Sequence, residues 1–238
     1  MTQKRTSSTL TNEGLYRLIN WFSPSFPIGA YSYSRGLESA IEQDFVNNQL
    51  NLVDWIGTDL LHGPGWIDAV LFSHVFHAAN SENKNTLLDL AALAYALRGS
   101  AELARESSAQ GKAFARTVSE CWSLIEIDEF QQRLTARDIE ITLPVAAALS
   151  CATDKIPLRE SLFFYVQANA SNLVSAGVRL IPLGQSDGQR ALRSLNTSIC
   201  DAVERAPATA LDNLGTSAPM IDLMSMAHET QYTRLFRS

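Results

Sequence analysis

The sequence has few cysteines and no excess of positive charge. Its three cysteines, Cys121, Cys151 and Cys200, lie far apart among 238 residues and form no CxxC pair. This spacing predicts neither a disulfide framework nor a thiolate zinc site, and it favours a reduced, cytoplasmic setting. Lys and Arg number 19 against 25 Asp and Glu, a net charge of −6, so we expect no nucleic-acid partner.

Several other features are missing. The N-terminus has no apolar signal-peptide core, and we expect residues 1–10 to form a flexible tail. The uncharged stretch between Glu160 and Arg179 is long enough to cross a membrane, but polar residues such as Gln167 and Asn169 would lack partners in lipid. We therefore expect no membrane span. Phosphate loops, nucleophile elbows, dinucleotide motifs and HExxH are also absent, which argues against an enzyme.

Apolar residues recur with a helical period through most of the chain. Leu15, Leu18 and Phe22 share one helix face, and further helices are predicted at about 33–45, 52–62, 66–80, 85–98, 100–123, 145–153, 158–180, 187–205 and 220–233. The alternating stretch 139–143 resembles a strand that has nothing to pair with, and we interpret it as an extended linker. We expect residues 11–238 to form a single all-α domain, a compact bundle of about ten helices without significant sheet.

Four residues make the best candidate for a metal site. These are His62, Asp68, His74 and His77, and the last two are three residues apart on a predicted helix, where they could share a face. Packed or surface histidines are the commoner explanation for such a pair. The sequence therefore predicts no metal centre.

One region carries only negative charge. Between Gly36 and Asn83 there is no Lys or Arg, whereas the region holds the acidic residues Glu38, Glu42, Asp44, Asp54, Asp59, Asp68 and Glu82. Two interpretations stay open. These residues form either solvated helix faces or a docking surface for a basic partner.

The segment Phe26–Glu38, FPIGAYSYSRGLE, combines a turn with a predicted helix. If the helix begins near Ala30, Tyr33 faces the core and Tyr31 is exposed beside Glu38 and Glu42. Tyr31 is then either an ordinary surface tyrosine or an anchor for a partner protein.

Two later segments also use unusual residues. Small residues in SNLVSAGVRLIPLGQSDGQ (171–189) allow another helix to approach, and Ser186 with Gln189 has the spacing of a capping box. The C-terminal segment from Met220 contains every methionine except the first, and it ends with the apolar Leu235 and Phe236. Either a partner or the protein's own body could bury these residues.

Together with MSMAHETQYTRLFRS (224–238), these segments resemble the family of the urease accessory protein UreF, over nearly the whole chain. Arg35 is a departure, because many members have an uncharged polar residue or histidine at this position. UreF proteins are all-α, usually dimeric and not themselves enzymes. The resemblance implies a protein without a cofactor that binds UreD (also called UreH), recruits the GTPase UreG, and acts with them on urease apoprotein. There UreF couples the GTP state to nickel insertion.

The resemblance also implies roles for individual residues. Tyr31 and Arg234 match family residues that recruit UreG. We expect UreD binding to order the tail from about Met220, which places Arg234 near Tyr31. The expected partner-binding residues are Tyr31, Glu38, Glu42, Met224, His228, Tyr232, Arg234, Leu235 and Phe236. Two alternatives stay open, a generic all-α scaffold unrelated to urease and a metal-dependent hydrolase.

Overall fold

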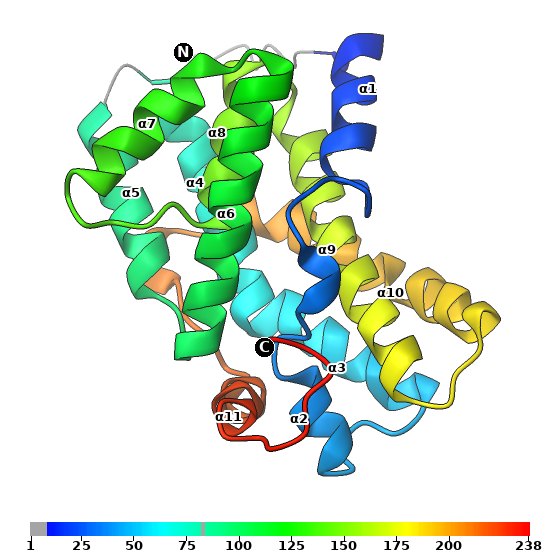
Figure 1. Ribbon diagram of the computed structural model, residues 1–238. Helices are drawn as coiled ribbons and strands as arrows, with labels where there is room; N and C mark the ends of the chain where they lie inside the picture. Colours follow the sequence, from blue (N-terminus) through cyan, green and yellow to red (C-terminus); the bar gives the residue numbers. More distant parts are fainter. Residues whose placement is uncertain (1–8, 82–83) are drawn as a thin grey trace.

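Helix α9 crosses the centre of the molecule, and most other helices pack around it (Figure 1). The computed structural model describes residues 9–81 and 84–238. Its helices are α1 (Asn12–Trp21), α2 (Leu37–Glu42), α3 (Gln49–His62), α4 (Pro64–Ala79), α5 (Lys84–Ala96), α6 (Ala101–Trp122), α7 (Ile125–Thr135), α8 (Leu143–Thr153), α9 (Leu158–Leu180), α10 (Gln185–Arg205) and α11 (Pro219–His228). No strand occurs in the described ranges, and the predicted all-α fold is confirmed.

Helices α4 and α8 form the apolar interior. They lie side by side, and nearly every residue from Gly65 to Phe76 in α4 and from Leu143 to Ala152 in α8 is buried. A helix that is apolar on all sides is stable only when other helices cover it. Helices α5, α6, α7 and α9 contact α8, and α3, α9 and α10 contact α4.

Glycine allows two close approaches between segments. A Cβ atom at Gly111 of α6 would lie 2.4 Å from the carbonyl oxygen of Ile141 in the linker before α8. A Cβ atom at Gly177 of α9 would lie 2.6 Å from Cδ2 of Leu52 in α3. The predicted role of small residues in α9 is thus confirmed, because a larger side chain at Gly177 would push α3 away.

Several sequence-based boundaries were wrong. The helix predicted at 33–45 covers only Leu37–Glu42, and the one predicted at 220–233 ends at His228. Helix α7 was missed, although Ile127, Phe130 and Leu134 have helical spacing. The predicted capping box is wrong, because Ser186 lies inside α10; instead, the N-cap Gly184 donates its N–H to Oδ2 of Asp187 at 3.0 Å. The stretch before α8 is an unpaired linker, as predicted.

Two sequence-based expectations concern the ends and the membrane. The predicted N-terminal tail, residues 1–10, lies outside the described residues except for its last two. None of the helices in the described ranges has the length and hydropathy needed to cross a bilayer.

Candidate partner-binding site: the Tyr31 turn and the C-terminal tail

The Tyr31 turn, Ala30–Ser32, is a single 3₁₀ turn that stands apart from α2. Gly29 begins it in the left-handed conformation, with φ of 71°, and Gly36 precedes α2 with φ of 78°. Gly36, together with Arg35 at φ of 55°, prevents one continuous helix from the turn into α2. Tyr31 is 70% exposed, as predicted, but the helix register from which this was predicted is wrong.

Helix α11 packs tightly against the start of α2. A Cβ atom at Gly36 would lie 2.5 Å from the backbone nitrogen of Ser225, so only glycine fits there. The hydroxyl of Ser225 lies 2.6 Å from that of Ser100, the N-cap of α6, and both are buried. Helix α11 is therefore joined to α2 and α6 together.

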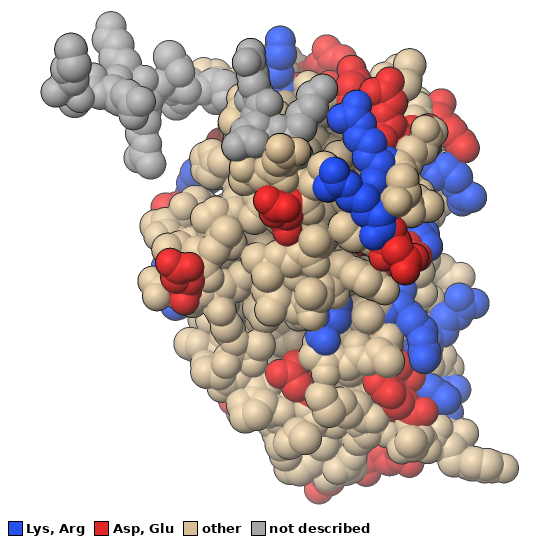
Figure 2. Space-filling view, turned by 90° about the vertical axis from the view of Figure 1, so that its left-hand side faces the viewer, with Lys and Arg blue, Asp and Glu red and all other residues tan. Residues whose placement is uncertain are grey.

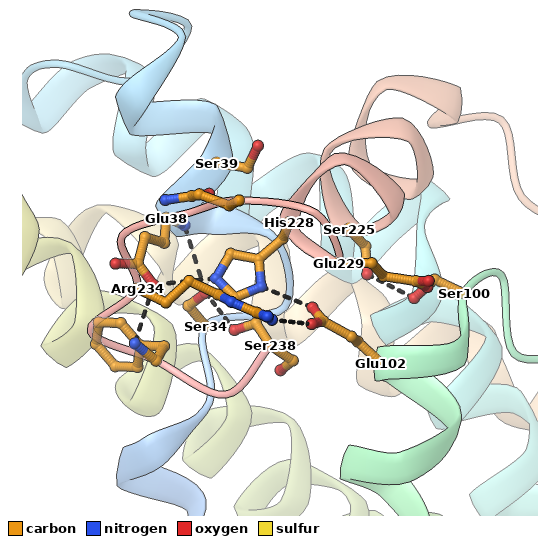
Figure 3. Close-up of polar contacts among 12 residues, drawn as sticks. Ser34, Glu38, Ser39, Ser100, Glu102, Ser225, His228, Glu229, Arg234 and Ser238 are labelled. Carbon is orange, nitrogen blue, oxygen red and sulfur yellow. Dashed lines mark hydrogen bonds and ion pairs between the residues drawn. The ribbon is translucent and has the colours of Figure 1, made fainter.

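His228, the last residue of α11, bridges two carboxylates (Figure 3). Its Nδ1 lies 2.6 Å from Oε2 of Glu102 on α6, and its Nε2 lies 3.0 Å from Oε2 of Glu38 on α2. The two ring nitrogens therefore connect α11 to both α2 and α6. All three side chains are buried, so the contacts are shielded from water.

The C-terminal tail, residues 229–238, continues from His228 across α2. The carboxylate of Glu38 accepts the backbone N–H of Leu235 at 2.6 Å and that of Phe236 at 2.9 Å. On the other side, Arg234 Nη1 donates to Oε1 of Glu102 at 2.7 Å. Two buried carboxylates from different helices therefore hold the tail (Figure 3).

The tail also pairs with the backbone beside the Tyr31 turn. The Arg237 N–H donates to the Ser32 carbonyl at 2.8 Å, and the Ser34 N–H donates to the Ser238 carbonyl at 2.6 Å. A helix beginning at Ala30 would use these same Ser32 and Ser34 groups for its own hydrogen bonds. The docked tail and the helix predicted there therefore exclude each other.

Arg179 connects the tail with the Tyr31 turn. Its guanidinium stacks on the ring of the buried Phe236, 4.4 Å from the ring centroid, and its Nη2 donates to the Tyr31 carbonyl at 2.9 Å. Phe236 is thus buried on the protein's own body. Tyr232 and Leu235 of the same tail are exposed.

Comparison with known proteins shows the same family that the motifs indicated. Residues 46–196 match the UreF family model. The chain belongs to the UreF family. It is 47% identical to "Urease accessory protein UreF" of Granulibacter bethesdensis over 98% of this chain and 97% of that protein. A protein of the same name in Rhodopseudomonas palustris is 43% identical over 94% of this chain and 93% of its own length.

In this UreF-family chain, the predicted partner-binding residues fall into two groups. Glu38, Met224, His228 and Phe236 are buried and hold α11 and the tail in place. Tyr31, Glu42, Tyr232, Arg234 and Leu235 reach the surface, and Tyr31 and the tail lie side by side. The expectation that Glu38 is exposed beside Tyr31 was wrong, because the tail covers it.

The acidic region is also not one surface. Glu38, Asp59 and Asp68 are buried in ion pairs, Glu82 lies outside the described residues, and only Glu42, Asp44 and Asp54 are exposed. On the face drawn in Figure 2, Asp and Glu mostly lie apart from one another or beside Lys and Arg. The two interpretations of this region, solvated helix faces and a docking surface for a basic partner, both need exposed carboxylates. For the buried Glu38, Asp59 and Asp68, both were wrong.

Arg35 lies at the centre of a buried charge cluster that sequence reasoning missed. Its guanidinium nitrogens lie 3.7 Å from Asp59, 3.2 Å from Asp68 and 3.4 Å from Glu106, and Arg98 approaches Asp68 to 2.7 Å. The tail reaches this cluster, because the Ser238 hydroxyl donates to Oε2 of Glu106 at 2.6 Å. Lys and Arg are almost never fully buried unless paired. The residues next to Arg35 in the sequence, however, gave no sign that it would be buried against three distant carboxylates.

Burial shifts the pKa values in this cluster. Burial raises the pKa of Asp59 and Glu106, and it does so although Arg35 acts in the opposite direction. For Arg35, burial alone lowers the pKa, but Glu106, Asp68 and Asp59 together raise it above the ordinary value. The guanidinium therefore stays charged at every accessible pH.

The raised pKa of Asp59 predicts that this residue contributes less to the stability of the fold at neutral pH than at acidic pH. A carboxyl with a raised pKa in the folded state binds its proton more tightly there, so its contribution to stability falls as the pH rises above its ordinary value near about 4. We expect the free energy of unfolding of Asp59→Asn, relative to that of the natural chain, to be higher at pH 7 than at about pH 5. Urea unfolding measures both. Glu42→Gln on the surface is the control. An equal difference in unfolding free energy at both pH values would contradict a raised pKa for Asp59.

The four candidate residues for a metal site do not come together. His74 Nε2 lies 2.8 Å from the Thr209 carbonyl, the His62 carbonyl accepts the Ser217 N–H, and Asp68 belongs to the Arg35 cluster. Burial, followed by the nearby His74, lowers the pKa of His77. Within the described part of the chain, no three His, Cys, Asp or Glu residues are placed to hold a metal ion.

Proposed function

We propose that this chain is a urease accessory protein that acts as a scaffold. It binds UreD (UreH), recruits the GTPase UreG to urease apoprotein, and thereby couples the GTP state of UreG to nickel insertion. The names of its relatives, urease accessory protein UreF, support the role in urease maturation. We further propose that the chain works as a homodimer without catalysing a reaction itself.

One observation carries the proposal for recruitment. The docked C-terminal tail and the Tyr31 turn share backbone hydrogen bonds and the side chain of Arg179. A partner that stabilises the docked tail therefore also stabilises the exposed position of Tyr31. We propose that UreD is this partner and that UreG binds the surface formed by Tyr31 and the tail. Recruitment of UreG then depends on UreD binding first.

Arg234 and Tyr31 have different roles in this proposal. Arg234 pairs with Glu102, which also holds His228, so Arg234 fixes the tail and need not touch UreG itself. Tyr31 makes no side-chain hydrogen bond among the described residues and is 70% exposed, which leaves its ring for a partner.

The test is to replace each residue with alanine and measure both complexes. We expect Arg234→Ala and Tyr31→Ala to retain UreD binding and to lose uptake of UreG, measured by size-exclusion chromatography with light scattering. Arg193→Ala, at an exposed position of α10, is the control and should bind both partners. Tyr31→Ala should leave the melting temperature unchanged because its side chain is exposed. A variant that loses UreD and keeps UreG would overturn the order of assembly.

A further inference from the structure

Two exposed arginines, Arg179 and Arg237, contact the Tyr31 turn. In the last residues of the tail, Phe236 and Ser238 are buried whereas Leu235 and Arg237 are exposed. This alternation is that of an extended segment, and it places Leu235 and Arg237 on the same outward side. Arg179 is exposed at the end of α9 and touches both the Tyr31 carbonyl and Phe236. Tyr31, Leu235, Arg179 and Arg237, here called the basic rim, therefore lie together.

The neighbouring carboxylates point inward. Glu38, Glu102 and Glu106 are buried beneath the tail, and each already accepts hydrogen bonds from tail residues. Arg234 is neutralised by Glu102. Among the described residues, by contrast, no carboxylate lies within ion-pair distance of Arg179 or Arg237. Two cations without an ion-pair partner in the described ranges thus lie near Tyr31, although the chain as a whole carries −6.

Arg179 is held in a position suited to bind a carboxylate. Its Nε donates to the Ser175 carbonyl at 3.2 Å and its Nη2 to the Tyr31 carbonyl, whereas Nη1 has no hydrogen-bond partner in the described part of the chain. Stacking on Phe236 fixes the plane of the guanidinium and leaves its edge free. A guanidinium whose plane is fixed loses little entropy when it forms a further charged hydrogen bond.

We propose that the basic rim is a docking surface for an acidic protein surface, with Arg179 and Arg237 binding its carboxylates and Tyr31 and Leu235 its apolar side chains. The inference rests on the proposed function, in which the partner at this surface is UreG. One interpretation of the acidic region was a docking surface for a basic partner. The basic rim instead favours an acidic partner, and Glu38, Asp59 and Asp68 of the acidic region are buried. Two apolar anchors beside two cations favour a protein over a nucleic acid, which needs a wider positive surface.

Charge reversal tests the proposal. Arg237→Glu changes charge without disturbing a side-chain contact, Arg179→Glu removes the stacking as well, and Arg193→Glu on α10 is the control of equal charge. The dissociation constant for UreG is measured on the complex with UreD, at about 0.05 M and about 0.5 M salt. We expect each rim variant to bind UreG about tenfold more weakly at low salt, and less salt-dependently, than the control.

The outcomes separate the two claims. If the unmodified chain with UreD does not bind UreG, the proposed function fails, and the inference fails with it. If the unmodified chain binds UreG but Arg237→Glu binds it equally well or more tightly, only the acidic-partner inference is overturned. The same holds if Arg179→Glu and Arg193→Glu weaken binding equally, because net charge would then explain the effect. Tighter binding of a short RNA than of UreG would show that the rim takes phosphates.

Discussion

Replacing Glu38 with alanine is expected to release the C-terminal tail. The Glu38 carboxylate accepts hydrogen bonds from the Leu235 and Phe236 N–H groups, it lies 3.0 Å from Nε2 of His228, and it is buried. Each buried donor left without an acceptor costs about 1–3 kcal/mol. The tail can avoid this cost by undocking, because its groups then bind water.

The release is measured by hydrogen exchange and trypsin. In Glu38→Ala, we expect the Leu235 and Phe236 amides to exchange at least about a hundredfold faster, which corresponds to about 2.7 kcal/mol. Trypsin should also cleave after Arg234, which the docked tail holds against Glu102. Glu42→Ala, one turn later on α2 and exposed, is the matched control and should change neither. Unchanged protection in Glu38→Ala would show that packing of Phe236 alone holds the tail.

The loss of the tail has a consequence for recruitment. Undocking frees the Ser32 carbonyl and the Ser34 N–H, and it removes Phe236 from beneath Arg179. The Tyr31 turn then loses the contacts that fix its position, so Tyr31 is no longer held in one place on the surface. In the proposed function, Glu38→Ala therefore loses UreG although Glu38 itself touches no partner.

At this site, contacts between residues far apart in the sequence determine structure that local sequence patterns do not predict. Tyr33, Leu37 and Ile41 have helical spacing, but the helix begins only at Leu37. Before it, Arg35 and Gly36 are left-handed, and the backbone groups of Ser32 and Ser34 pair with residues about 200 positions later. Long helices such as α6 and α9 were predicted because their own periodicity determines them. The exposure of Tyr31 could be predicted, but the burial of Glu38 could not, since it depends entirely on the tail.

Charge patterns have the same limit. Counting carboxylates between residues 36 and 83 predicts an acidic region, but Asp59 and Asp68 lie on the inner faces of α3 and α4, opposite Arg35. Their partners, Arg35 and Arg98, lie in loops far from them in the sequence, so the sequence offers no spacing from which the cluster could be derived. The position of Arg35, where the resemblance to the family is imperfect, was the one visible sign.

Replacing Arg35 with methionine is expected to destabilise the whole fold. Methionine fills much of the same volume, but it leaves Asp59, Asp68 and Glu106 close together with Arg98 as the remaining cation nearby. Breaking a buried ion pair by removing one partner costs about 3–5 kcal/mol. We expect the free energy of unfolding at pH 7 to fall by that amount. Arg159→Met, in an exposed pair with Glu204, should cost less than about 1 kcal/mol.

The pH dependence of this loss identifies its cause. Without Arg35, the pKa of Asp59 and Glu106 rises further, because the attraction that opposed the effect of burial is gone. The folded variant then takes up protons at a higher pH than the natural chain, so the loss should shrink as the pH is lowered from 7 to about 5. Adding Asp59→Asn should restore part of the stability at pH 7, since Oδ1 of the amide can still accept the Gly65 N–H. A loss that is equal at both pH values and is not relieved by Asp59→Asn would mean that Arg35 acts by packing alone, and the three carboxylates would then not depend on its charge.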